Sequence, residues 1–293
     1  MELERVKGNT WVLKSWELIP LYQVDDTRCI LLDTGTVDQR AELEAALDQA
    51  GLTPVAILGS HAHIDHMGSY GYFQKTRGAV LALTLGEAGQ LFSPLGLQLQ
   101  YYNLSLGAFG QYPELESAPC LPDRIILPQE REVTLCGVTF GLVRTDAMMT
   151  GRVLHRAKFP YAFSMKVYLE SLAKLRQESA DRFIVAHRGV YREILPFIDL
   201  ELRFLTQRME DLLTLVGEST TPKELTEAIC RTYQVRTKNP RHLAYFEQAS
   251  QTYLHYLTDR GDLELVMAED QLRYRRVNRR RERLTLPPTG RFR

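Results

Sequence analysis

The sequence predicts an α/β fold followed by a small, mainly helical part that ends in a β-hairpin. Two patterns lead to this prediction. Between residues 9 and 191, short β-type runs alternate with amphipathic helical stretches, and polar loops follow the buried runs. Beyond Leu195 the pattern becomes helical over long stretches. With 293 residues, 44% of them hydrophobic, the chain can bury a large core and carry an appendage.

The opening β-type runs predict an antiparallel sheet, and they comprise residues 9–16, 19–24 and 29–32. The third run ends in Asp33-Thr34-Gly35, a turn placed directly after a buried strand, so polar groups there are expected to be held rigidly. Residues 39–50 have apolar side chains at helical spacing, and Gly51 provides a stop. Residues 54–58 predict a short buried strand that runs into the polar loop 59–68.

The middle of the chain predicts a long loop and then further β-structure. Residues 93–122 are rich in Gly, Pro, Ser, Asn and Tyr and have no sustained period, which predicts a loop over a site. The β-type runs that follow are residues 124–127, 132–135, 138–145 and 183–186, with a short helix at 168–175. The last of these runs ends in His187-Arg188-Gly189.

The pattern of the C-terminal part predicts three helices, at residues 202–216, 221–233 and 244–260. Two β-type runs follow, at residues 263–267 and 271–277, and predict a hairpin. Thr221-Pro222-Lys223-Glu224 is a helix start, with Thr as the cap, Pro at the first helical position and Glu at the third. This order resembles a winged helix. We therefore expect an α/β domain at 1–195, a winged-helix-like domain at 196–277 and a basic tail at 278–293.

One cluster of side chains points to chemistry. Three histidines and one aspartate lie within six residues, on the loop after a buried strand: His61, His63, Asp65 and His66. Imidazole and carboxylate are ligands that Zn²⁺ favours, and the alternate spacing lets the first two histidines point the same way. The cluster therefore predicts a metal centre that activates water for hydrolysis.

These residues resemble the metallo-β-lactamase superfamily, which includes glyoxalase II-like hydrolases. Residues 60–68 resemble its HxHxDH signature, and Asp33-Thr34-Gly35 resembles the aspartate turn that precedes it. Residues 146–149 resemble the end of a later Gly-Asp segment, and residues 186–189 resemble the segment with the final histidine. The resemblance covers residues 9–191 and implies an αββα sandwich, with metals at one edge of two facing sheets.

The resemblance implies that His61 and His63 bind one metal. It implies that a second metal is bound by Asp65, His66 and His187, and that Asp146 bridges the two metals. Asp65 is also assigned the catalytic role. Asp33 would accept hydrogen bonds that orient the ligand histidines, a role whose loss weakens metal binding or activity roughly tenfold to a hundredfold. The implied metal is zinc, as one or two ions, with manganese or iron as alternatives.

The sequence departs from the family after Thr145. In the family a Thr-Pro-Gly-His segment supplies the third imidazole of the first metal, but here Asp146 follows directly. We favour an intact second site that supports a mononuclear or weakly dinuclear enzyme. Alternatively His155 replaces the missing ligand, although Arg152 and Arg156 beside it disfavour a nearby cation. A third interpretation is that catalysis is lost and a relic of the fold remains.

The end of the chain is strongly basic. Its arginines are Arg273, Arg275, Arg276, Arg279, Arg280, Arg281 and Arg283. They would suit phosphate contacts if they formed one face. We favour a solvated tail over a nucleic-acid site, because few aromatic residues lie among the arginines and the formal net charge of the chain is +0.

The predicted function is hydrolysis of an ester, thioester or related acyl bond by a metal-activated water, with a metal stabilising the oxyanion. The alternatives are a catalytically impaired binding protein, and a phosphodiesterase or nuclease on the same fold. The expected partner is a small-molecule substrate, with a homodimer allowed and no membrane. We expect a cytoplasmic location, because residues 1–10 lack the apolar core of a secretory signal and no stretch has the length of a membrane-spanning helix.

Overall fold

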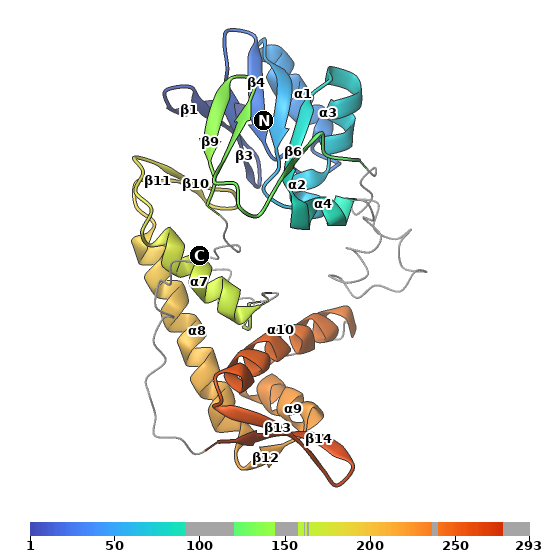
Figure 1. The fold of residues 1–293 in the computed structure, drawn as a ribbon, viewed down its shortest axis with the longest axis vertical. Coiled ribbons are helices and arrows are strands. Elements are labelled where there is room, and N and C mark those ends of the chain that lie inside the picture. The colour runs from blue at the N-terminus through green and yellow to red at the C-terminus, as the bar shows by residue number, and fades with distance from the viewer. Residues whose placement is uncertain (92–119, 144–157, 161, 163, 236–239, 278–293) are drawn as a thin grey trace. The chain divides into compact units, whose positions relative to one another are not determined.

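In a computed structural model of the chain, the residues described are 1–91, 120–143, 158–160, 162, 164–235 and 240–277. They belong to two compact units (Figure 1). The first unit is Met1–Val143 with Ala180–Arg192, and the second is Arg144–Ser179 with Glu193–Arg293. This division differs from the predicted boundary at residue 195, because helix α7 (Met165–Leu175) groups with the C-terminal helices.

Seven strands of the first unit form one mixed sheet in sequence order. They are β1 (Glu2–Lys7), β2 (Thr10–Lys14), β3 (Leu18–Gln23), β4 (Arg28–Leu32), β5 (Thr53–Leu58), β6 (Val80–Thr84) and β7 (Arg124–Ile126). The first four strands pair antiparallel, and β4 to β7 pair parallel. Because parallel strands end at the same edge of a sheet, the loops after β4, β5 and β6 lie at one edge.

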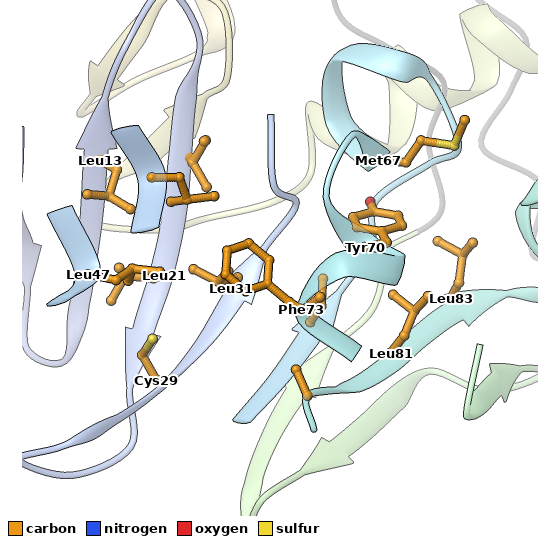
Figure 2. Close-up of a cluster of buried hydrophobic side chains, with 14 of the residues drawn as sticks. Leu13, Leu21, Cys29, Leu31, Leu47, Met67, Tyr70, Phe73, Leu81 and Leu83 are labelled. Atoms are coloured by element: carbon orange, nitrogen blue, oxygen red, sulfur yellow. The ribbon is translucent and has the colours of Figure 1, made fainter. Parts of the chain in front are cut away.

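Helices cover one face of this sheet. They are α1 (Arg40–Gln49), α2 (Ile64–Met67), α3 (Tyr70–Arg77) and α4 (Leu85–Leu91). Helix α1 confirms the predicted helix at 39–50, and its periodic apolar residues, Leu43, Ala46 and Leu47, are buried. Figure 2 shows the core, where Tyr70 and Phe73 of α3 lie among leucines of the strands.

A small second sheet covers the opposite face. It consists of β8 (Glu132–Leu135) and β9 (Val138–Gly141), paired antiparallel. Val133 and Leu135 of β8 pack with Ile30, Ala56 and Ala82, which alternate with the strand residues of the other core cluster. Strand β9 ends before the predicted limit at residue 145. A separate hairpin of β10 (Phe183–Val185) and β11 (Gly189–Tyr191) completes the described first unit.

The second unit confirms the prediction of helices followed by a hairpin. Besides α7 it contains α8 (Leu195–Val216), β12 (Ser219–Thr220), α9 (Pro222–Thr232), α10 (Pro240–Asp259), β13 (Leu263–Ala268) and β14 (Gln271–Arg276). Helix α8 begins earlier than predicted, because Pro196 lies in its first turn, where no backbone N–H is needed. Glu269 and Asp270 have positive φ, as a two-residue hairpin turn requires.

The predicted cap of α9 is present. The Glu224 backbone N–H donates to Thr221 Oγ1 at 3.2 Å, and the Thr221 N–H donates to Glu224 Oε2 at 2.9 Å. We expect Thr221→Ala to lower the free energy of unfolding by about 1 kcal/mol, measured by urea denaturation. Thr214→Ala is the control, since this hydroxyl in the last turn of α8 bonds only the carbonyl of Glu210 in the described contacts. An equal loss in both variants would contradict the capping role.

Candidate metal centre

Five of the six predicted ligands are described, and they lie together at one edge of the seven-stranded sheet, within the first unit. His61 and His63 lie in the loop after β5, Asp65 and His66 lie on α2, and His187 follows β10. The side chain of His66 is buried, whereas that of His187 is 40% exposed. The predicted ligand Asp146 lies outside the described residues, as does His155.

The ring nitrogens and carboxylate oxygens of these residues face one another. His61 Nε2 lies 2.9 Å from His63 Nδ1. Asp65 Oδ2 lies 3.8 Å from His66 Nε2 and 3.5 Å from His187 Nε2. The ring of His66 is the centre of the group, with its centroid 4.2 Å from that of His61 and 5.4 Å from that of His187. This is a nitrogen and oxygen donor set of the kind that suits zinc.

Asp33 accepts four hydrogen bonds from residues in and beside the ligand cluster. Its Oδ1 accepts from the Ser60 N–H at 2.7 Å and from the Tyr70 hydroxyl at 2.6 Å. Its Oδ2 accepts from the Ser60 hydroxyl at 2.5 Å and from His66 Nδ1 at 2.9 Å. Although Asp33, His61 and His66 are close enough to hold an ion by distance alone, both oxygens of Asp33 are already engaged. The hydrogen bond from His66 Nδ1 to Asp33 leaves Nε2 of His66 3.8 Å from Asp65 Oδ2.

The backbone around Asp33 is locked to the ligand segment. Asp33 has φ of 68°, a left-handed conformation that Asp tolerates better than most residues. The next residue, Thr34, donates its N–H to the His66 carbonyl at 2.8 Å, and its hydroxyl accepts from the Ser69 N–H at 3.0 Å. These bonds fix α2 against the turn after β4, so the two predicted loops form one rigid edge.

The charges of the site favour a cation. Burial lowers the pKa of His61 to about 3, and it also lowers the pKa values of His63 and His187, so these imidazoles are neutral and offer lone pairs. Burial opposes protonation of His66 too. The hydrogen bond and charge of Asp33, with Asp65 and Glu17, nevertheless raise the pKa of His66 to about 9. The surrounding carboxylates thus stabilise positive charge at the position of this ring.

Glu17 was not predicted from the sequence. It lies between β2 and β3, its side chain is buried, and Oε2 is 3.7 Å from His187 Nδ1. Trp16 stacks on His187 with ring centroids 5.3 Å apart. The Leu18 N–H donates to the Ala186 carbonyl at 2.5 Å, which holds this segment beside the end of β10. A single glutamate in a β-type stretch belongs to no recognisable motif, so its position beside the predicted ligands is seen only in the structure.

Two of the arginines that the structure describes on the C-terminal hairpin, Arg273 and Arg275, form ion pairs with glutamates of that hairpin. Arg275 Nε lies 2.7 Å from Glu264 Oε1, and Arg273 lies 3.2 Å from Glu269. The tail from residue 278 lies outside the described residues. Among the helices that the structure describes, none is long and apolar enough to cross a membrane.

An α/β sandwich with imidazoles and carboxylates gathered at a strand edge defines a class of metal-binding proteins, and the comparisons agree. The profile of the metallo-beta-lactamase superfamily matches residues 19–187. The chain therefore belongs to the metallo-beta-lactamase superfamily, whose members are typically metal-dependent hydrolases. No curated protein sequence matches it.

Solved structures support the fold. A beta-lactamase domain protein from Burkholderia ambifaria has a TM-score of 0.68 and 17% sequence identity, with 94% of each chain covered. A metallo-beta-lactamase family protein from Thermus thermophilus has a TM-score of 0.61 and 19% identity, over 94% of this chain and 98% of that one. At these identities the likeness concerns the fold alone. It includes the C-terminal unit, since both matches span nearly the whole chain.

Proposed function

We propose that this protein is a metal-dependent hydrolase that cleaves an ester, thioester or related acyl bond. The observation that carries the proposal is the convergence of Asp65, His66 and His187, with Asp33 fixing the orientation of His66. Zinc fits this donor set, and manganese or iron are the alternatives. When bound, such a metal supplies water activation near neutral pH and polarises an acyl oxygen.

The residues of the chain take separate parts in this proposal. His66 and His187 would hold the ion with Asp65, whose partly exposed carboxylate could also position a water molecule and accept a proton from it. His61 and His63 present neutral nitrogens to a second ion, for which the described residues supply no third imidazole. The proposal is therefore a mononuclear or weakly dinuclear enzyme.

Metal removal tests the proposed function. Purified protein is treated with a chelator, and the metal-free and the Zn²⁺-, Mn²⁺- or Fe²⁺-reloaded forms are assayed on esters, thioesters, lactones and phosphodiesters. We expect acyl hydrolysis that disappears with the metal and returns with it. Cleavage of phosphodiesters alone would replace the acyl substrate class by a phosphoryl one. Stoichiometric metal binding without hydrolysis of any substrate would instead support a non-catalytic binding protein.

A nucleic-acid function receives less support. The two described arginines with close acidic partners, Arg273 and Arg275, are neutralised on the hairpin itself. Salt-sensitive binding to DNA or RNA that disappears when residues 278–293 are deleted would revive this alternative.

A further inference from the structure

Glu17 is a buried carboxylate at the edge of the metal centre. Only 1% of its surface is exposed, and its neighbours in the chain are fixed, since Leu18 bonds the Ala186 carbonyl and Ser15 donates its hydroxyl to the Glu17 carbonyl. The backbone at Glu17 is therefore held in place, which limits where its carboxylate can lie.

One carboxylate oxygen of Glu17 lacks a hydrogen-bond partner in the described structure. Oε2 is buried, and the ring nitrogen Nδ1 of His187 lies 3.7 Å away, too far for a hydrogen bond. Burial disfavours the ionised form of a carboxyl group unless a cation or hydrogen-bond donor compensates its charge. Proteins therefore tolerate such a group mainly where a ligand pairs with it.

The unpartnered oxygen lies among the metal donors. Glu17, Asp65, His66 and His187 each offer one ligand atom, and these four atoms all lie within 4.8 Å of one another. The four residues come from three separate segments of the first unit, so their convergence is a property of the fold. Two imidazoles and two carboxylates make a complete four-coordinate set for zinc.

We propose that Glu17 is a direct ligand of the metal held by Asp65, His66 and His187. This inference rests on the metal site of the proposed function, and it adds a ligand outside the residues that the family resemblance assigns. The second carboxylate gives this site four donors from the described residues, without counting the predicted bridging ligand Asp146. The competing role for Glu17 is to orient His187 through Nδ1 without touching the metal.

Metal binding, measured without any substrate, tests Glu17. Zn²⁺ affinity is determined by chelator competition for the wild type and for Glu17→Gln, and the Co²⁺-loaded forms are compared by their visible spectra. We expect the variant to bind Zn²⁺ at least roughly tenfold more weakly, since a lost ligand costs no less than a lost outer hydrogen bond. We also expect the Co²⁺ spectrum to change, because the number of donors changes.

Matched variants separate ligation from structure. Glu44→Gln removes a partly buried carboxylate that bonds Tyr72, away from the site, and should leave affinity and spectrum unchanged. Metal-free Glu17→Gln should be about as stable as the wild type in thermal denaturation, because the amide has the shape of a carboxyl group whose pKa is raised by burial to about 8. A merely structural glutamate would make the metal-free protein less stable.

The outcomes distinguish this inference from the proposed function. Weaker Zn²⁺ binding with an unchanged Co²⁺ spectrum would assign Glu17 to orienting His187 and overturn ligation. Unchanged affinity would overturn it as well, while leaving the hydrolase proposal in place. A wild-type protein that binds Zn²⁺ through Glu17 yet hydrolyses nothing would support the ligand and refute only the activity.

Discussion

Gly68→Ala is expected to lower the free energy of unfolding by roughly 3 kcal/mol or more and to abolish metal binding. A Cβ atom at Gly68 would lie 2.4 Å from the Val37 nitrogen, 2.5 Å from the Thr36 carbonyl carbon and 2.6 Å from the Gly35 oxygen. All three atoms belong to the backbone, so no side-chain rotation relieves the overlap. The segment after His66 would have to move away from the turn after Asp33.

This movement would reach the metal centre directly. The Gly68 N–H donates to the Gly35 carbonyl at 2.9 Å, and the His66 carbonyl accepts from Thr34 at 2.8 Å. Separating the two segments would break these bonds and the contact between Asp33 and His66. The variant should therefore lose both stability, measured by urea denaturation, and Zn²⁺ binding, measured by metal analysis.

Gly89→Ala is the matched control. Gly89 lies in α4, and a Cβ atom there would meet nothing within 4 Å. Because alanine is the better helix former, this change should leave stability equal or higher by up to about 1 kcal/mol. If Gly68→Ala unfolds at the same urea concentration as Gly89→Ala, the close approach of the two loops is not required by the fold.

Much of the first unit was predictable because its signals are local. The periodic apolar residues of α1 and the buried run of β5 each determine their own structure. The motif residues His61 to His66 follow a strand that parallel pairing aligns with the strand before Asp33. The cap at Thr221 is equally local, since the residues that make it lie within one turn.

Features that depend on distant contacts were not predictable. Strand β1 is largely polar and exposed, and only its pairing with β2 makes it a strand. Helix α3 has no sustained apolar period, yet Tyr70 and Phe73 are buried. Tyr70 donates a hydrogen bond to Asp33, and Phe73 packs in the hydrophobic core. Glu17 joins the site only through the contact between Leu18 and Ala186, which are far apart in the sequence.

His66→Ala should weaken Zn²⁺ binding by more than about a hundredfold, the upper range for losing an outer partner alone. It removes a ligand whose ring faces Asp65 and lies at the centre of the histidine cluster. The variant also leaves Oδ2 of Asp33, a buried carboxylate, with only the Ser60 hydroxyl as a partner. His255→Ala, which removes an exposed histidine on α10, is the control and should bind Zn²⁺ normally.

Asp33→Asn tests whether Asp33 acts through His66. Asparagine fits the same space and tolerates the positive φ at this position, so the fold should persist. We expect Zn²⁺ affinity to fall roughly tenfold to a hundredfold, because the amide NH2 group cannot accept the hydrogen bonds that one Asp33 oxygen receives from Ser60 and either Tyr70 or His66. If orientation of His66 is the function of Asp33, the double variant Asp33→Asn with His66→Ala should bind little worse than His66→Ala alone. Fully additive losses would instead mean that Asp33 contributes to the ion independently, as a ligand or through its other hydrogen bonds.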